Sequence, residues 1–478
     1  MREITSADIA RITGGRIVGA ADGTETVHGK ATVDSRAVSP GDLFIAFEGE
    51  RADGHDFLDK AHAAGAALSL VTRESAVGTE YPAVLVNDPQ AAIDALARHE
   101  LDTARSSADA PTVIALTGSS GKTSTKDLLA SILIPVADTI APVGSRNNEL
   151  GLPLTVLEAS ESTRFMVLEM GARGIGHIAH LTQIARPDVS LVLNVGTAHV
   201  GEFGSVDNIA VAKSELVSAL DSDGVAVLNA DDPRVAAMCE NTTARVEYFS
   251  ASSAQGAPVW ASDISLSDSA TPQFTLHVGN ESRPVTLRLT GEHHVSNALA
   301  AASAAHAAGV GLDAIVAGLE TATTRSPGRM EVTQVRDGIT IINDAYNANP
   351  DSMKAALKAL AHVGRQRRTI AILGEMLELG DGAVKAHDEI GRLAVRLNIS
   401  KLLVVGQGAR AIHNGASLEG SFGGESDYVE NVDEARTVLE KIAEPGDAIM
   451  LKSSNGAGLA RLGEKLVADW SVNGEERE

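Results

Sequence analysis

The sequence predicts an α/β protein of three domains: a small α/β domain first, then a doubly wound sheet, then a second doubly wound sheet. Short apolar runs alternate with amphipathic stretches in the middle of the chain and again near its end, as parallel sheets covered by helices require. With 478 residues, the chain is too long for a single hydrophobic core. Two polar stretches, residues 102–111 and 321–329, are expected to be linkers.

The first domain is expected over residues 1–105. Its strand signals, DLFIAF (42–47) and AVLVND (83–88), are shorter and more mixed than those elsewhere in the chain. A helical pattern follows from Pro89 to about Leu101. These signals predict a compact mixed unit.

The central domain is expected over residues 106–322. Leucines and isoleucines at 128, 129, 132 and 133 have helical spacing. Four apolar runs around that helix read as buried strands: TVIALTG (112–118), MVLEMG (166–171), VSLVLNVG (189–196) and GVAVLNADD (224–232). Strands that alternate with helices in this way indicate a parallel sheet with helices on both faces.

The last domain is expected over residues 323–478 and repeats the same alternation. Its apolar runs are ITIINDA (339–345), RTIAILGEM (368–376), KLLVVGQGA (401–409) and DAIMLKSS (447–454). We expect a second doubly wound sheet here.

Composition excludes several classes of function. The formal charge of −23 and a pI of about 5.0 disfavour binding to nucleic acid or to anionic membranes, because both need a basic surface. Cys239 is the single cysteine, which excludes an internal disulfide framework. The N-terminal stretch has no apolar core of a secretory signal, and no apolar run is long enough to cross a bilayer. We expect a soluble cytoplasmic protein.

The stretch TGSSGKTSTK, residues 117–126, follows an apolar run and precedes an amphipathic helical pattern. Backbone N–H groups of such a turn and of the helix after it converge on one anion site. Lys122 can then reach the outer phosphates of a nucleotide, and the Thr123 hydroxyl can ligate Mg²⁺. The expected nucleotide contacts are Gly118, Ser119, Ser120, Gly121, Lys122, Thr123 and Ser124.

The spacing of this loop is unusual. The common phosphate-binding pattern has four residues between its first glycine and Gly-Lys-Ser/Thr, whereas only Ser119 and Ser120 separate Gly118 from Gly121. The residues alone therefore leave open an ordinary strand–turn–helix corner with a surface lysine.

Two further side chains follow neighbouring apolar runs. Glu169 lies at the end of the apolar run in MVLEMG, and His199 lies just after VSLVLNVG. Ligands of open α/β sheets gather at the carboxyl ends of strands, and Mg²⁺ needs oxygen ligands beyond a single hydroxyl. A solvated strand end for Glu169 and a structural role for His199 remain alternatives.

Several motifs in sequence order resemble those of the Mur ligases, the ATP-dependent peptide ligases of peptidoglycan synthesis. The short TGSSGKT loop is the usual form of the P-loop in that family. The remaining motifs are DSRAVSPGDLFIAFEGERADGHDF (34–57), SRNNELGLPLTVL (145–157), LNVGTAHVGEFGS (193–205), GEHHVSNALAA (291–301), PGRME (327–331) and INDAYNANPDSMKAAL (342–357).

This resemblance implies a UDP-binding N-terminal domain, a central P-loop domain and a C-terminal Rossmann-like ligase domain. It also implies an ADP-forming reaction in which ATP phosphorylates a peptide carboxylate and an amine attacks the acyl phosphate. NDAYNANPDSM and LGEMLELGD are most similar to the member that joins D-alanyl-D-alanine to UDP-N-acetylmuramoyl-tripeptide. The implied cofactors are ATP and two Mg²⁺ ions, and a monomer is expected.

The resemblance assigns roles around the phosphates. Lys122 holds the β- and γ-phosphates, with Thr123 and Glu169 on one magnesium ion and His199 near the second. Lys213 matches a lysine that is carbamylated in the family, which makes it an anionic oxygen ligand. Without the resemblance, Lys213 reads as a surface residue of a helix.

Other matches concern the nucleotide and the peptide substrate. Asn297 and Asp344 match contacts to the base and ribose, although a helix N-cap and a strand-end turn are the plainer readings. Arg329 matches an arginine that reaches the γ-phosphate on domain closure, or else is a surface charge beside a hinge. The expected contacts of the UDP-linked substrate are Ser35, Arg36, Asn147 and Asn148.

The chain departs from the family pattern after its last apolar run. Where members often have K-G-S-R, this sequence has KSSN, with Ser453 for the glycine and Asn455 for the arginine. Loss of the guanidinium removes a bidentate carboxylate partner, so the local substrate contact is in doubt.

Three rival functions remain. The preceding Mur ligase adds lysine or diaminopimelate, but the DDPR stretch (231–234) that suggests it lies in the central domain. A folylpolyglutamate-synthase-like enzyme shares the loop but lacks the DSRAVSPGDLF module. A nucleotide-binding regulator without turnover would not need the full set of Lys122, Thr123, Glu169, His199 and Lys213.

Overall fold

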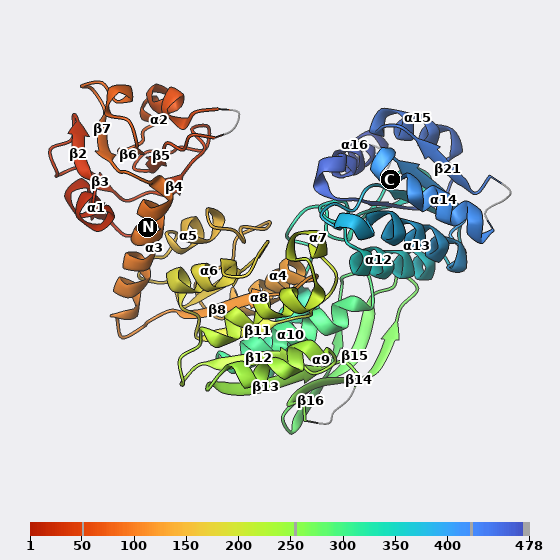
Figure 1. Ribbon diagram of the computed structural model, residues 1–478. Coiled ribbons are helices and arrows are strands. Elements are labelled where there is room, and N and C mark those ends of the chain that lie inside the picture. The colour runs from red at the N-terminus through yellow and green to blue at the C-terminus, as the bar shows by residue number, and fades with distance from the viewer. Residues whose placement is uncertain (50–51, 253–255, 421–423, 472–478) are drawn as a thin grey trace, which may run out of the picture.

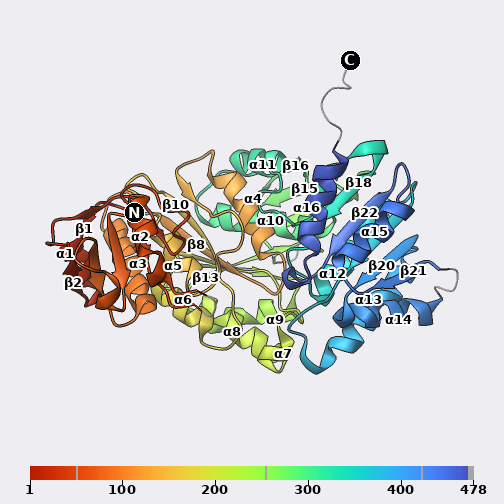
Figure 2. The ribbon, with the colours of Figure 1, turned by 90° about the horizontal axis from the view of Figure 1, so that it is seen from above.

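The computed structural model describes residues 1–49, 52–252, 256–420 and 424–471; Glu50 and Arg51 of the first family-like motif, and the last seven residues of the chain, lie outside them. Figure 1 shows the N-terminal part in red and orange, the central part from orange (β8 and α4) through yellow to green, and the C-terminal part mainly in blue. The view from above in Figure 2 shows the same order. The predicted α/β fold class with three domains is confirmed.

The N-terminal part contains a five-stranded sheet in the order β2-β7-β6-β5-β4, with a separate pair β1-β3. Strands β4 to β7 are parallel, and β2 is antiparallel to β7. The strands are β1 (Ile4–Thr5), β2 (Arg16–Gly19), β3 (Thr26–Val27), β4 (Ala31–Thr32), β5 (Leu43–Ile45), β6 (Leu68–Val71) and β7 (Pro82–Leu85). The helices are α1 (Ser6–Thr13), α2 (Leu58–Ala63) and α3 (Pro89–Arg105).

Helix α3 leads out of this part. Asp88 caps it by accepting the N–H groups of Gln90 and Ala91, and Pro89 occupies the first turn, where its missing N–H costs nothing. The helix continues to Arg105, past the expected end near Leu101. The first residues of the predicted linker 102–111 are therefore helical, and the prediction of a linker there was too long.

The central sheet has nine strands in the order β16-β15-β14-β13-β12-β11-β8-β10-β9. Strands β8 to β14 are parallel, and β15 and β16 complete an antiparallel meander with β14. The strands are β8 (Thr112–Thr117), β9 (Thr139–Ile140), β10 (Phe165–Glu169), β11 (Val189–Val192), β12 (Val225–Asn229), β13 (Arg245–Ser250), β14 (Val259–Leu266), β15 (Pro272–Val278) and β16 (Glu281–Thr286). The four predicted strands are confirmed; the meander was not predicted.

Helices cover both faces of this sheet, as predicted. Alternate residues of β8 point to opposite faces: Val113 and Ala115 join the core under α5, α6 and α8, and Ile114 and Leu116 join the core under α4, α10 and α11. The helices are α4 (Lys122–Leu133), α5 (Gly151–Val156), α6 (His177–Ala185), α7 (Val200–Phe203), α8 (Val206–Ser218), α9 (Pro233–Ala236), α10 (His293–Ala307) and α11 (Leu312–Thr321).

The C-terminal sheet has six strands in the order β17-β18-β22-β19-β20-β21, all parallel except β17. The strands are β17 (Glu331–Gln334), β18 (Thr340–Asn343), β19 (Thr369–Leu373), β20 (Lys401–Val405), β21 (Ser426–Val429) and β22 (Ala448–Lys452). Each of the four predicted runs forms a strand. Its helices are α12 (Pro350–Val363), α13 (Ala383–Arg396), α14 (Arg410–Glu419), α15 (Val432–Ile442) and α16 (Leu459–Trp470).

The segment between α11 and β17 is anchored at both ends. Ser326 belongs to the central side, because its N–H donates to Asp127 Oδ2 at 3.1 Å and its Oγ accepts the Gly144 N–H at 3.0 Å. Gly328 belongs to the C-terminal side, because its carbonyl accepts the Tyr346 N–H at 3.2 Å. The chain therefore passes from the contacts of one sheet to those of the other at Pro327.

A second attachment lies at the turn between β14 and β15. The Ser267 carbonyl lies 2.8 Å from His362 Nε2 on α12, and Ala270 is fully buried in the apolar cluster of the C-terminal sheet. The unpredicted meander thus reaches the next domain (Figure 1). Within the described residues, no helix has both the length and the apolar character needed to cross a bilayer.

Candidate functional site

The loop between β8 and α4 is held against the strand beside it. The N–H of Ser119 donates to the Asn194 carbonyl at 3.2 Å, and that of Ser120 donates to Asn194 Oδ1 at 2.9 Å. Gly121 has φ +79, and a Cβ there would lie 2.6 Å from Asn297 Oδ1. The loop therefore needs glycine at this position both for its backbone and for the close approach of Asn297.

Lys122 begins α4 and folds back over the loop. Its Nζ donates to the Gly118 carbonyl at 2.6 Å. Burial lowers the pKa of Lys122, while the charge of Glu169 acts in the opposite sense. The ammonium thus lies over the loop that the sequence predicts to bind phosphates, and the reading as a surface lysine is wrong.

Glu169, at the end of β10, is a buried carboxylate with three donors. Thr123 Oγ1 donates to Oε2 at 2.9 Å, and Ser145 Oγ and Asn147 Nδ2 donate to Oε1 at 2.8 Å each. Only 3 % of Glu169 is exposed, so it is not a solvated strand end. Hydroxyl and carboxylate oxygens together are the ligand type that Mg²⁺ prefers, and Thr123 with Glu169 fits such an ion.

Lys213 lies on α8 and is 5 % exposed, so the reading as a surface residue of a helix is wrong. Burial, and next the charge of Lys122, hold its pKa well below the ordinary value. Neither of these two influences on its pKa comes from a carboxylate. A neutral buried amine is the form that reacts with carbon dioxide, so the surroundings of Lys213 fit a carbamate and its metal.

His199 precedes the short helix α7 with a left-handed backbone, φ +61. Its Nδ1 lies against the carboxylate of Glu378, which comes from the C-terminal domain. Burial lowers the pKa of His199, and the Glu378 charge opposes that shift. No sequence signal marked Glu378, although it lies in the noted motif LGEMLELGD.

Three predicted nucleotide contacts come from different elements. Asn297 lies inside α10, four residues after its first residue, so the alternative of an N-cap is wrong. Asp344 follows β18, accepts the Met330 N–H at 3.0 Å and pairs with Lys452 Nζ at 2.6 Å. The Arg329 guanidinium lies 4.2 Å from the centre of the Tyr346 ring.

One cleft of about 590 Å³ joins these side chains. It takes its walls from the central and C-terminal parts. The predicted site residues that line it are Ser119, Ser120, Gly121, Lys122, Thr123, Ser124, Asn147, Asn148, Glu169, His199, Lys213, Asn297, Arg329 and Asp344. Lys452, from the KSSN stretch, and His293, from GEHHVSNALAA, also line it, although sequence reasoning assigned His293 no firm role. Sequence reasoning missed other lining residues, among them Arg173, His177, Tyr346, Asn349, Asp351 and Glu378.

The KSSN stretch is only partly exposed to this cleft. Lys452 and Ser453 are buried, and Lys452 holds Asp344 as described. Ser454 Oγ accepts the Leu377 N–H at 3.0 Å, and Asn455 lines the cleft. The position of the missing guanidinium therefore faces the site, whereas the serine that replaces glycine is packed inside.

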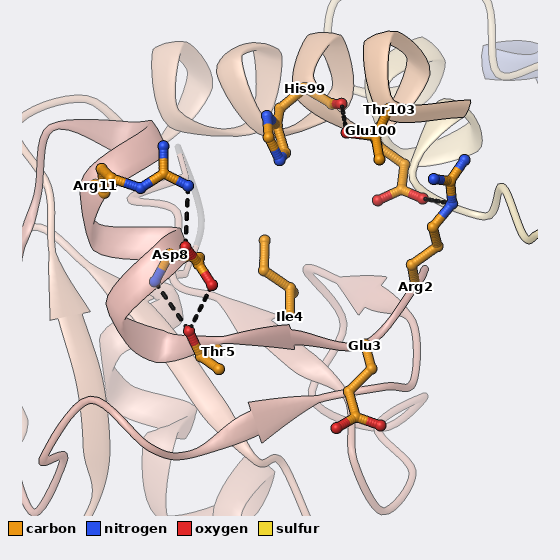
Figure 3. A pocket seen from close by; sticks show the side chains of 9 residues that line it. All are labelled: Arg2, Glu3, Ile4, Thr5, Asp8, Arg11, His99, Glu100 and Thr103. Carbon is orange, nitrogen blue, oxygen red and sulfur yellow. Dashed lines mark hydrogen bonds and ion pairs between the residues drawn. The ribbon is translucent and has the colours of Figure 1, made fainter. Parts of the chain in front are cut away.

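Ser35 and Arg36 are not among the residues that line the cleft. Ser35 is buried in the N-terminal domain, and the exposed Arg36 pairs with Asp34 at 2.8 Å. A separate hollow of about 330 Å³ lies elsewhere in that domain, between β1, α1 and α3 (Figure 3). Its charged groups largely pair with one another, as Arg2 does with Glu100 at 3.2 Å.

Family models match three consecutive parts of the chain. They are the Mur ligase family catalytic domain at residues 29–101, the Mur ligase middle domain at 116–305 and the Mur ligase glutamate ligase domain at 328–455. The chain belongs to the Mur ligase family. The middle-domain match begins inside β8 and includes the loop, Glu169, His199 and Lys213.

Relatives and structures within the Mur ligase family are similar over nearly the whole chain. The UDP-N-acetylmuramoyl-tripeptide–D-alanyl-D-alanine ligase of Mycobacterium tuberculosis is 46 % identical over 98 % of both chains. The crystal structure of MurF from Acinetobacter baumannii has a TM-score of 0.84 at 33 % identity and 98 % coverage of both chains. The MurF ligase of Thermotoga maritima, solved with ADP, has a TM-score of 0.76 at 27 % identity, covering 92 % of this chain and 97 % of its own.

Proposed function

We propose that this Mur ligase joins D-alanyl-D-alanine to a UDP-N-acetylmuramoyl-tripeptide at the expense of ATP, forming ADP and phosphate in peptidoglycan precursor synthesis. The observation that carries the proposal is the similarity over nearly the full length to ligases of that name. The cleft supports it with a phosphate-type loop facing Glu169 and Lys213. We place the protein in the cytoplasm, as a monomer, with no nucleic-acid partner.

The first step transfers a phosphoryl group. A carboxylate oxygen of the tripeptide attacks the γ-phosphorus of ATP, and ADP leaves. Lys122 and the N–H groups of the loop stabilise the charge on the phosphates, and Arg329 reaches the γ-phosphate from the C-terminal domain. Asn297 and Asp344 hold the base and ribose of the nucleotide.

The second step forms the amide. The amine of D-alanyl-D-alanine attacks the carbonyl carbon of the acyl phosphate, loses a proton, and phosphate leaves. Asn147 and Asn148, from the wall of the cleft, and Ser35 and Arg36, from the N-terminal domain, bind the UDP-linked substrate. Because Asn147 also donates to Glu169, the substrate contact and the phosphate site are adjacent.

Thr123 and Glu169 would hold one Mg²⁺ ion, and His199 with a carbamate on Lys213 would hold a second. Bound magnesium shields the crowded negative charge of phosphates and carboxylate. The chain's own contribution is to place these ligands on β10, α4 and α8 around the same loop.

The deciding experiment measures phosphate release from ATP with two acceptors: UDP-N-acetylmuramoyl-tripeptide with D-alanyl-D-alanine, and UDP-N-acetylmuramoyl-dipeptide with lysine or diaminopimelate. We expect release only with D-alanyl-D-alanine. Release only with a free diamino acid would contradict the proposal and indicate the preceding ligase of the pathway. That alternative is not favoured, because the relatives that match over nearly the whole chain are named for the dipeptide.

A further inference from the structure

His199 belongs to the central domain, but the carboxylate beside it does not. Glu378 follows β19 of the C-terminal sheet, 179 positions further along the chain. Its Oε2 lies directly against His199 Nδ1, and both residues line the cleft. The pairing therefore exists only while the C-terminal domain is docked on the nucleotide loop.

The backbone around this pair is built for close approach. The Gly201 N–H donates to the Glu378 carbonyl at 3.2 Å, so side chain and main chain of Glu378 both contact the segment around α7. A Cβ on Gly201 would lie 2.5 Å from the Gly380 nitrogen. Any side chain at position 201 would collide with the backbone at Gly380. The close approach of the two segments therefore requires glycine at Gly201.

The same segment has a second contact with the C-terminal domain. Thr197 N–H donates to Asp351 Oδ2 at 3.3 Å. In the nucleotide loop, outside this segment, the Ser119 carbonyl accepts from Asn349 Nδ2 at 3.4 Å. Residues 197–201 are thus held along their length by the other domain. The orientation of His199 depends on this docking.

A carboxylate against Nδ1 has a defined chemical effect on an imidazole. It favours the tautomer with the proton on Nδ1 and leaves the lone pair on Nε2. Histidines that bind metals usually have such a carboxylate or carbonyl on the other nitrogen, which fixes the ring and increases its basicity.

We propose that Glu378 is a positioning residue for His199, which it holds in the tautomer and orientation needed to bind a divalent cation in the cleft. The inference rests on the proposed function for the identity of that cation. Because Glu378 comes from the other domain, His199 is held in this way only when the domains are docked, and cation affinity reports docking.

Glu202 provides the comparison that tests this role. Its carboxylate lies in the same cluster, where one ligand atom from each of His199, Glu202 and Glu378 falls within 4.8 Å of the others. Of the two carboxylates, Glu378 is the one that lies against the imidazole. If the three side chains formed a cation site of their own, both carboxylates would matter equally.

The experiment titrates Mn²⁺ into the nucleotide-free full chain and measures free Mn²⁺ by electron paramagnetic resonance, for the wild type, Glu378→Gln and Glu202→Gln. We expect Glu378→Gln to weaken one class of Mn²⁺ site by roughly 10- to 100-fold, the usual effect of losing such a partner. Glu202→Gln should bind as the wild type does. In turnover, Glu378→Gln should need more Mg²⁺ and have a lower kcat, with the KM for ATP unchanged.

Unchanged Mn²⁺ affinity in Glu378→Gln would overturn the proposal, as would equal weakening in both variants. Circular dichroism and melting curves establish that each variant is folded before its titration. The Mn²⁺ titration contains no acceptor amine, so its result is independent of which amine the enzyme uses. Failure of the proposed function would instead appear as absent release with D-alanyl-D-alanine in the wild type.

Discussion

Lys213 illustrates how burial changes the chemistry of one side chain. The amine is almost fully enclosed, and its pKa is lowered first by burial and then by Lys122. A protonated lysine there would add a second positive charge beside the first. A carbamate would reverse that charge and supply oxygen ligands, which agrees with the role proposed for it.

We expect Lys213→Ala to lower kcat on the order of 10²-fold, the size typical of losing one electrostatic contact in an active site. Bicarbonate with a short carboxylate such as acetate should restore part of the activity, because it replaces the missing oxygen ligand. Steady-state phosphate release measures both effects.

Lys213→Arg is the matched control for that experiment. It keeps the length and charge but cannot carry a carbamate, so it should stay inactive with added carboxylate. Full activity of either variant would remove Lys213 from the metal site.

Single residues differ in how far the sequence could identify them. Lys122 and Glu169 are identifiable because a loop pattern and the ends of strands place them at one edge of the sheet. Lys213 is identifiable only through family resemblance, since helical spacing alone cannot distinguish it from a surface lysine. Glu378 and Tyr346 were missed because their partners, His199 and Arg329, come from other elements and only the fold brings them together.

Among the elements, the segment between α11 and β17 determines how the two larger domains can move. Asp127 lies on α4, the helix that starts with Lys122, and it fixes Ser326 at the beginning of the pivot. Lys126 Nζ pairs with the same carboxylate at 2.6 Å in a buried site. The helix that follows the nucleotide loop thus also anchors the hinge.

Gly328 has φ +67 at this pivot, a backbone conformation that alanine adopts at a cost of about 1–2 kcal/mol. A Cβ there would also lie 3.3 Å from Tyr346. We expect Gly328→Ala to lower kcat/KM for ATP by roughly tenfold, because the strain opposes the docked arrangement. Steady-state kinetics and melting curves provide the measurement.

Gly338→Ala is the control, since Gly338 has φ +70 but no atom within 4 Å of the place where an alanine methyl group would lie, and it is outside the pivot. It should lose stability by a similar amount while keeping kcat/KM. Equal kinetic losses in the two variants would show that backbone strain in general, and not the pivot, causes the effect.

The sequence predicted those strands whose two faces are both buried. The parallel strands form continuous apolar runs, because both of their faces are covered by helices. The meander β14 to β16 was missed because β14 has five consecutive residues that are exposed or only partly buried, so no apolar run marks it. Its antiparallel pairing depends on neighbours rather than on local sequence.

At the scale of the whole molecule, buried histidines make stability depend on pH. Burial lowers the pKa of His293 to about 4, and burial also holds the pKa of His294 well below the ordinary 6.5. Both nitrogens of His294 lack a hydrogen-bond partner among the described residues. Below about pH 6.5 these histidines bind protons in the unfolded chain but not in the folded chain. Their contribution to the free energy of unfolding is therefore fully present above that pH and decreases below it.

We therefore expect the apparent melting temperature to fall less between pH 7.5 and pH 5.5 in His294→Asn than in the wild type. Carboxyls with raised pKa, such as Asp188 and Asp447, act in the opposite direction in both proteins, so the comparison isolates the histidine. An equal fall in the two proteins would contradict this account.

The turn of the meander has a mechanical consequence. A rigid body attached at one point has three rotational degrees of freedom. A second attachment leaves only rotation about the line that joins the two points. The chain segment at Pro327 is one attachment, and the contact of Ser267 and Ala270 with the C-terminal domain is the other. With two attachments, the C-terminal domain can rotate only about the line that joins them. The contact between His199 and Glu378, away from that line, holds the domain in the docked position.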